Sequence, residues 1–173
     1  MTNRLDGMTA VITGACSGIG LGMAEAYVDE GARVAILDVQ TDEFDAVESQ
    51  LDGETLTVEC DVRDADQVEA AVDHVLETWG GIDVVVNNAG VVVRNSVTDT
   101  TDEEMEFVLD VDLKGVMRVA RETIPALQAS GGTMINISSA AAEGGVAELS
   151  AYTAAKGGVS ALTRQLAAEY GSD

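Results

Sequence analysis

The chain alternates short apolar runs with longer segments in which apolar residues recur at helical spacing. In residues 64–79, for example, Val68, Ala71, Val72 and Val75 lie three or four positions apart, which predicts one buried face of a helix. The short runs are at residues 9–13, 33–38, 55–60, 82–87 and 133–137, and the helical segments at about 19–30, 42–51, 64–79, 101–129 and 150–170.

Short apolar strands separated by helices are typical of a parallel sheet that is covered on both faces. Right-handed crossovers then give a doubly wound sheet. We therefore predict an α/β fold of the Rossmann type with five parallel strands in the order 3-2-1-4-5, forming a single domain over residues 1–173. Pro125 lies late in segment 101–129, where the loss of a backbone hydrogen bond should kink or end the helix.

The net charge of −22, from 31 acidic and 9 basic residues, limits the possible partners. Nucleic acids and anionic membrane surfaces attract the opposite sign, so we expect neither as a partner. The acidic residues are spread along the chain, which favours a halophilic origin, although a generally acidic protein remains the alternative. No apolar run could span a bilayer, and the first residues lack the apolar stretch of a secretory signal, so we expect a cytoplasmic protein.

A glycine-rich loop, Thr-Gly-Ala-Cys-Ser-Gly-Ile-Gly at residues 13–20, joins the first strand to the first helix. Gly14 would allow the sharp turn, Gly18 the approach of a pyrophosphate, and Gly20 the close packing of the helix. Amide groups at the helix N-terminus would then bind the phosphates, and we assign Ser17 and Ile19 to the same site. Such a loop can also be only a tight turn, but between a strand and a helix it predicts a dinucleotide site.

Acidic and small residues follow the next strands. Asp38 ends the second strand, where a carboxylate would bind the adenine ribose and repel a 2′-phosphate, so we expect NAD rather than NADP. Alternatively, Asp38 caps the turn. Asp61 and Val62 suit the adenine edge, and Asn88, Ala89 and Gly90 follow the fourth strand, where small residues leave room for the cofactor. Asn87, just before them, could bind there or tie neighbouring strands together.

Tyr152 and Lys156 are four positions apart and should share one face of the last helix. A phenol beside an ammonium group is an acid–base pair suited to a carbonyl and its alcohol. The hydroxyl of Ser139, at the end of the preceding strand, could contribute to the same site.

Cysteine and histidine are too few for a zinc site. Cys16 and Cys60 lie in different elements, and His74 is the one histidine, so we predict no bound metal. Cys16 lies near a helix N-terminus that could favour a thiolate, or it is a small residue that fills the loop.

Taken in order, the glycine loop, Asp38, Asp61-Val62, the Asn-Asn-Ala-Gly run at 87–90, Ser139 and the Tyr-Thr-Ala-Ala-Lys run at 152–156 resemble the short-chain dehydrogenase/reductase family. The resemblance implies hydride transfer between a nicotinamide and a small carbonyl or alcohol substrate. In it, Tyr152 is the acid or base, Lys156 lowers the pKa of Tyr152 and binds the nicotinamide ribose, and Ser139 polarises the carbonyl. It also implies a homo-oligomer.

The chain departs from the family pattern in two places. Asp112 stands where the family has a catalytic asparagine, and a carboxylate near Lys156 should raise the pKa of Tyr152, slow turnover at neutral pH and shift the optimum to alkaline pH. The resemblance also implies that family strands six and seven are missing, which would leave the strand at 133–137 as an unpaired edge. These departures leave two alternatives to an enzyme: a non-catalytic nucleotide-binding remnant, or an interaction module that recruits a partner strand.

Overall fold

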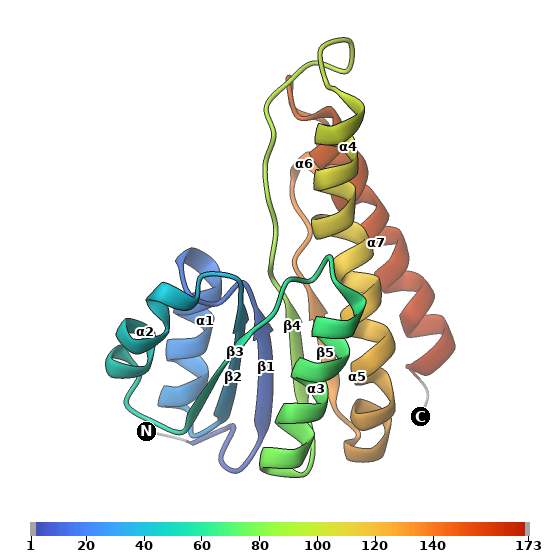
Figure 1. Ribbon diagram of the computed structural model, residues 1–173. Coiled ribbons are helices and arrows are strands. Elements are labelled where there is room, and N and C mark those ends of the chain that lie inside the picture. Colours follow the sequence, from blue (N-terminus) through green and yellow to red (C-terminus); the bar gives the residue numbers. More distant parts are fainter. Residues whose placement is uncertain (1–2, 172–173) are drawn as a thin grey trace.

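The computed structural model describes residues 3–171 and contains a five-stranded parallel sheet (Figure 1). The strand order β3-β2-β1-β4-β5 is the predicted one, so the Rossmann-type fold is confirmed. The two residues at each end of the predicted domain lie outside the described part of the chain. The strands are β1 (Thr9–Thr13), β2 (Arg33–Asp38), β3 (Thr55–Glu59), β4 (Val84–Asn87) and β5 (Thr133–Asn136).

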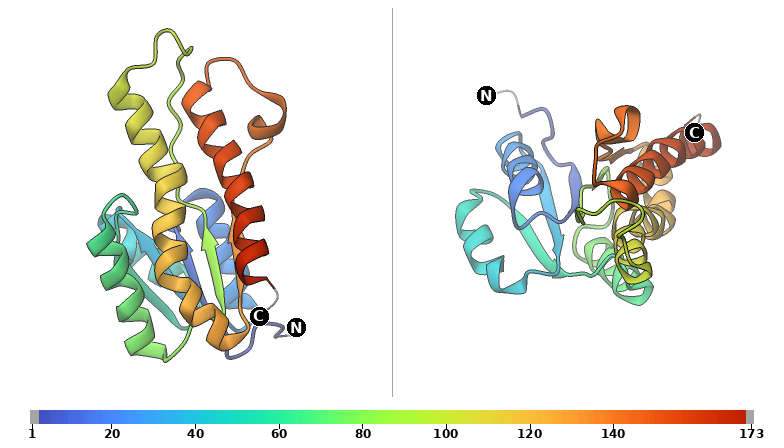
Figure 2. Two further views of the ribbon diagram at one scale, coloured as in Figure 1. Left: turned by 90° about the vertical axis from the view of Figure 1, so that its right-hand side faces the viewer. Right: turned by 90° about the horizontal axis from the view of Figure 1, so that it is seen from above.

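Helices connect the strands and cover both faces of the sheet, as two views show (Figure 2). Alternation along β1 separates the two cores, because Val11 packs with the residues of α3 and α5 whereas Ala10 and Ile12 pack with those of α1 and α2. The helices are α1 (Gly18–Asp29), α2 (Phe44–Gln50) after a 3₁₀ turn η1 (Thr41–Glu43), α3 (Ala65–Trp79), α4 (Asp102–Leu109), α5 (Val116–Ser130), α6 (Ala141–Gly144) and α7 (Ser150–Tyr170).

The segment predicted as one helix over 101–129 contains a π-helical turn, η2 (Asp110–Gly115), between α4 and α5. Its start agrees with the prediction, because Thr101 and Glu104 form a reciprocal capping box. The expectation that Pro125 ends the helix early is wrong, since α5 continues to Ser130. The distortion lies in η2, on the N-terminal side of Pro125, and π turns of this kind are frequent at functional sites.

Part of the chain rises beyond the carboxyl edge of the sheet (Figure 1). It comprises the segment after β4, helices α4 and α6, and the first turns of α7. A bridge between Asn95 and Leu149 joins the two sides, and the Asn95 amide donates hydrogen bonds to both carboxylate oxygens of Glu104 at 2.9 and 3.0 Å. This part of the molecule therefore stands over the edge where parallel sheets bind ligands.

Strand β5 is an edge strand, as predicted: within residues 3–171 its one strand neighbour is β4. Ile135 is 37% exposed, and a groove of about 260 Å³ lies between β5, α5 and α7.

Helix α6 was not predicted from the sequence. Among the helices of residues 3–171, none has the length and apolar character needed to cross a membrane.

Candidate active site and nucleotide cleft

The glycine loop packs closely against the end of β4. Gly14 has a φ of 64°, and a Cβ at this position would lie 2.8 Å from the Cα of Ala89, so both the conformation and the space require glycine. Gly20 lies under the loop, where a Cβ would be 2.6 Å from the Nδ2 of Asn88. Gly18 has a φ of 58° and open space around it, which leaves the loop backbone accessible from the cleft.

Thr13 and Asn88 fix the loop to the segment after β4. The Thr13 hydroxyl oxygen accepts hydrogen bonds from the backbone amides of Asn88 and Ala89, both at 3.1 Å. The Asn88 side-chain amide donates to the carbonyls of Thr13 and Gly14 at 3.0 and 2.9 Å. Sequence analysis placed Asn88 at the cofactor, whereas its amide nitrogen is already bound to the loop. Thr13 was not predicted, and its one sequence signal is its place between β1 and Gly14.

Asp38 is 4% exposed and lies at the end of β2. Its carboxylate accepts hydrogen bonds from the backbone amides of Cys16 at 2.9 Å and Gln40 at 3.0 Å. The predicted turn-capping role is therefore present, and Asp38 also lines the cleft.

Burial, reinforced by the Asp38 carboxylate, raises the pKa of the Cys16 thiol to about 12. Cys16 is thus a buried thiol that fills the loop, and the thiolate alternative is wrong.

Asp61 and Arg63 form the opposite wall of the cleft. The Arg63 Nε donates to both carboxylate oxygens of Asp61 at 2.9 Å, and this pairing holds the pKa of Asp61 below its usual value. The Arg63 guanidinium also lies 5.4 Å from the ring centroid of Phe107. The carboxylate of Asp61 is therefore engaged by its neighbour.

The cleft between these walls has a volume of about 490 Å³. It lies at the carboxyl edge of the sheet, which is the expected place for a ligand. Of the residues predicted to bind the nucleotide, Gly20, Tyr152 and Lys156 do not line it, whereas the others do: Gly14, Ser17, Gly18, Ile19, Asp38, Asp61, Val62, Asn88, Ala89 and Gly90.

Lys156 is 3% exposed and sits where α7 meets η2 and the end of β5. Its Nζ donates to the carbonyl of Ile137 at 3.0 Å and lies 3.3 Å from the Oδ2 of Asp112. It is also 5.8 Å from the ring centroid of Tyr152, one turn earlier on α7. The structure therefore brings Tyr152 and Lys156 together, as their spacing predicted, and places Asp112 beside Lys156, as the family resemblance implied.

Asp112 is completely buried. Its Oδ1 accepts a hydrogen bond from the Val91 amide at 2.8 Å, whereas Oδ2 has Lys156 at 3.3 Å but no well-aligned hydrogen bond within residues 3–171. Burial raises the pKa of Asp112, and the contacts with Val91 and Lys156 only partly oppose it. Gly90 connects this pair to the cleft, because a Cβ there would lie 3.2 Å from the Asp112 Oδ2 and 3.3 Å from the Lys156 Nζ.

The two serines after β5 have different environments. Ser138 donates to the Lys156 carbonyl at 3.0 Å and shares a 2.7 Å hydrogen bond with Ser160, so it anchors the strand end to α7. The Ser139 Oγ accepts from the Ala141 amide at 3.2 Å, at the start of α6, which leaves its hydroxyl proton available to donate. Asn87 proves to be a strand tie, because its amide donates to the Oδ1 of Asn136 on β5 at 2.8 Å.

Comparison with known proteins agrees with this arrangement. Residues 8–173 match the family model of the short-chain dehydrogenases. The chain is 38% identical to galactitol 2-dehydrogenase of Agrobacterium fabrum and 36% identical to sorbitol dehydrogenase of Cereibacter sphaeroides, and each alignment covers 83% of this chain and 57% of the relative. D-threitol dehydrogenase of Mycolicibacterium smegmatis is 37% identical over 80% of this chain and 55% of its own length.

Among solved structures, levodione reductase superposes with a TM-score of 0.94 at 34% identity. The superposition covers 97% of this chain and 68% of the reductase. The chain spans little more than half the length of the curated relatives above. Because the family model extends over nearly all of its residues, the chain belongs to the short-chain dehydrogenase family.

Proposed function

We propose that this protein is a nicotinamide-dependent oxidoreductase that interconverts a small alcohol and its carbonyl compound. One observation carries the proposal: the buried Lys156 ammonium lies between Asp112 and the Ile137 carbonyl, on the same helix face as Tyr152, beside a glycine-lined cleft. The relatives that act on galactitol, sorbitol and threitol favour a polyol or a similar compact alcohol as substrate.

The cleft suits a dinucleotide. Gly14 and Gly18 have left-handed backbone conformations, and no side chain at Gly18 stands between the loop and the cleft. The N-terminus of α1 begins at Gly18, so its first amide groups are available to phosphate oxygens. When bound there, a nicotinamide would supply or accept the hydride.

Each residue of the site has one role in this proposal. The Tyr152 hydroxyl gives a proton to the substrate oxygen during reduction and removes it during oxidation. The Lys156 ammonium, 5.8 Å from the centroid of the Tyr152 ring, would bind a ribose hydroxyl. The Ser139 hydroxyl donates to the substrate oxygen and polarises the carbonyl, consistent with its free proton. Asp112 holds Lys156 in place through the 3.3 Å contact between its Oδ2 and the Lys156 Nζ.

For the cofactor, we propose NAD in preference to NADP. Asp38 is a buried carboxylate on the cleft wall, and a 2′-phosphate beside it would meet like charge. Arg63, on the opposite wall, is already paired with Asp61. We expect Asp38→Asn to weaken the preference for NADH over NADPH by about tenfold, while Asp42→Asn, an exposed acid of the following 3₁₀ turn, leaves it unchanged.

The test combines nucleotide titration with turnover. NADH should bind to the protein, and oxidation of a panel of polyols and secondary alcohols with NAD should identify at least one substrate. Tyr152→Phe should retain NADH binding and lose at least about a thousandfold in kcat, because the proton donor is removed while the ring remains. The exposed Tyr170, at the far end of α7, provides the matched control Tyr170→Phe.

Two results would contradict the proposal. Absence of NADH binding would remove both the enzyme and the nucleotide-binding remnant, leaving the interaction module. Binding without turnover over the whole panel would favour the non-catalytic remnant.

We further propose that residues 1–173 act as one nucleotide-binding domain that also carries the catalytic groups, and that the protein assembles as a homo-oligomer. Light scattering at several protein concentrations tests the assembly.

A further inference from the structure

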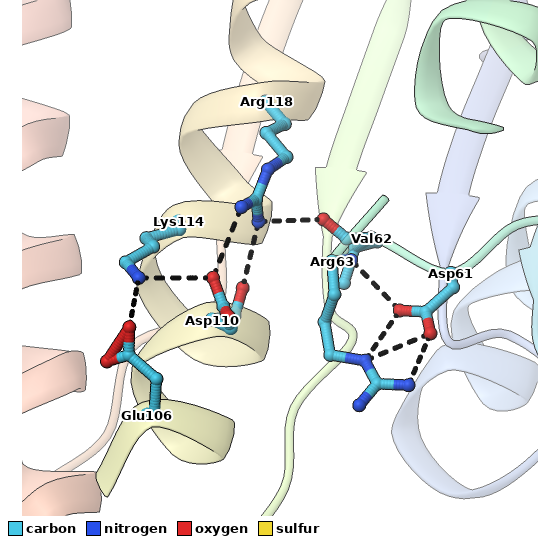
Figure 3. A network of polar contacts seen from close by, with 7 residues as sticks. All are labelled: Asp61, Val62, Arg63, Glu106, Asp110, Lys114 and Arg118. Carbon is cyan, nitrogen blue, oxygen red and sulfur yellow. Dashed lines mark hydrogen bonds and ion pairs between the residues drawn. The ribbon is translucent and has the colours of Figure 1, made fainter. Parts of the chain in front are cut away.

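A network of polar contacts connects the cleft wall at Asp61–Arg63 to the π-helical turn η2 (Figure 3). Arg118, on the first turn of α5, is its central member. The Nη1 of Arg118 donates to the Val62 carbonyl at 3.2 Å and to the Asp110 carbonyl at 3.3 Å, and its Nη2 donates to the Asp110 Oδ1 at 3.1 Å. One guanidinium group thus holds both the cleft wall and the first residue of η2.

We propose that Arg118 is a positioning residue, which sets the place of Asp112 beside Lys156 by clamping η2 to the main chain of the cleft wall. Its side chain is 21% exposed, does not line the cleft, and takes no part in the contact between Asp112 and Lys156. Arg118 therefore does not contact the proposed reacting groups directly, and η2 is the element that connects it to Asp112. The kinetic part of this inference rests on the proposed oxidoreductase function.

Packing within η2 supports a rigid connection. A Cβ at Gly115 would lie 2.8 Å from a methyl group of Val62, so the last residue of the turn is pressed against the same wall that Arg118 holds. A Cβ at Gly158 on α7 would lie 2.9 Å from a methyl group of Leu113. The turn is therefore packed between the cleft wall and α7, and Asp112 projects from it toward Lys156 and Val91.

Asp110 is well held by its neighbours. Lys114 lies 3.3 Å from its Oδ1 and also pairs with Glu106 at 3.0 Å. Lys114 is 44% exposed, so we expect its pair to contribute little in salt solution. Arg118 differs, because its fork reaches two backbone carbonyls as well as a carboxylate, and a lysine ammonium cannot reproduce that planar geometry.

The experiment uses three variants of the same helix. Arg118→Met removes the clamp, Arg118→Lys keeps the charge without the fork, and Arg121→Met is the control, since Arg121 is exposed and pairs only with Glu122 among the contacts of residues 3–171. The first readout needs no activity. The Val91 amide donates to Asp112, so its ¹⁵N–¹H resonance reports the position of that carboxylate.

We expect the Val91 resonance to move in Arg118→Met, to move less in Arg118→Lys, and to stay in place in Arg121→Met. In turnover, Arg118→Met should lower kcat by about tenfold and raise the KM for NADH by less than about threefold, because a small displacement near the reacting groups affects chemistry more than binding. In an Asp112→Ala background Arg118→Met should lower kcat by less than about twofold, since the carboxylate that Arg118 positions is gone.

An unmoved Val91 resonance in Arg118→Met would overturn the inference, whatever the activity. A raised KM with unchanged kcat would also overturn it, because Arg118 would then support only the cleft wall. If Arg118→Met does not fold, Arg118→Lys carries both readouts. A protein that shows the Val91 shift but no NADH-dependent turnover would refute the proposed function and leave the structural connection intact.

Discussion

The Oδ2 of Asp112 and the Nζ of Lys156 lie 3.3 Å apart, and both side chains are almost completely buried. Family resemblance implied an amide in place of this carboxylate. An asparagine could accept the same hydrogen bond from Val91 without bringing a charge into the interior. The carboxylate gains an ion pair but has to be desolvated, and the raised pKa of Asp112 shows that burial is the larger effect.

The raised pKa of Asp112 makes its contribution to stability dependent on pH. The folded protein favours the protonated carboxyl, so the stabilisation is complete below the unfolded pKa of about 4 and is lost as pH rises through the folded pKa. An asparagine side chain does not titrate, so Asp112→Asn does not lose stability in this way as pH rises. We therefore expect the free energy of unfolding of Asp112→Asn, relative to the unmodified protein, to increase as pH rises from about 4 to 8.

Urea denaturation at a series of pH values measures this difference, and Asp110→Asn is the matched control. Hydrogen bonds from Arg118 and Lys114, against an opposing effect of burial, hold the pKa of Asp110 below its usual value. Its stabilisation is present above the unfolded pKa and is lost as pH falls. The two variants should therefore show slopes of opposite sign, and equal slopes would contradict the environments described above.

Gly20 and Gly22 lie two positions apart on α1 and should respond oppositely to alanine. A Cβ at Gly20 would clash with the Gly14 carbonyl and approach the Asn88 amide to 2.6 Å, whereas a Cβ at Gly22 would have no other part of the protein within 4 Å beyond its own stretch of helix. Gly20→Ala should destabilise the protein by about 1–3 kcal/mol and weaken NADH binding, because the glycine loop must shift. Gly22→Ala should stabilise it by about 0.5–1 kcal/mol.

Thermal unfolding and NADH titration of the two glycine variants check this prediction. Equal stability of Gly20→Ala and Gly22→Ala would show that the contact between the loop and α1 is loose. A destabilised Gly20→Ala that still binds NADH normally would separate the packing of the helix from the shape of the nucleotide site.

Both cysteines should be unreactive in the folded protein. Burial is the main cause that raises the thiol pKa to about 12 at Cys16 and about 11 at Cys60. At pH 8 we therefore expect alkylation by iodoacetamide to be at least about a hundredfold slower than for an ordinary exposed thiol. Mass spectrometry of native and urea-unfolded samples measures this, and rapid native labelling of Cys16 would mean that the loop opens.

Sequence reasoning predicted the strand order and most of the residues that the structure places around the cleft, because each depends on local signals: apolar runs, glycine spacing and residues at strand ends. It missed the π turn because Asp110–Gly115 has the same apolar spacing as the flanking helices. The close contacts of that turn, between Val62 and Gly115 and between Leu113 and Gly158, join residues that are far apart in the sequence. The role of Arg118 could not be predicted from the sequence either, since two of its three acceptors are backbone carbonyls.

The polar role of Asn88 could not be read from the sequence either. An amide beside a predicted cleft suits a ligand, and only the structure shows its nitrogen bound to the Thr13 and Gly14 carbonyls. The placement of Asp112 near Lys156, by contrast, was implied by the family resemblance. Asp112, Tyr152 and Lys156 are brought together by the packing of η2 against α7 that the fold requires.

The net charge of −22 predicts that salt stabilises this protein. Raising KCl from 0.1 to 1 M shortens the Debye length from about 10 to 3 Å, which screens repulsion among dispersed carboxylates. The nine basic side chains offset little of this repulsion. The ion pairs of Arg4, Lys114 and Arg121 are largely exposed and therefore weak. We expect Tm at pH 7 to rise by more than about 4 °C, which corresponds to about 1–2 kcal/mol for a domain of this size.

The same salt series at about pH 4 is the control, because ordinary aspartate and glutamate side chains are about half protonated there. The rise in Tm should shrink markedly at that pH if repulsion among carboxylates is its cause. An equal rise at both pH values would instead indicate a general effect of salt on apolar burial, and it would remove the charge-based argument for a halophilic origin.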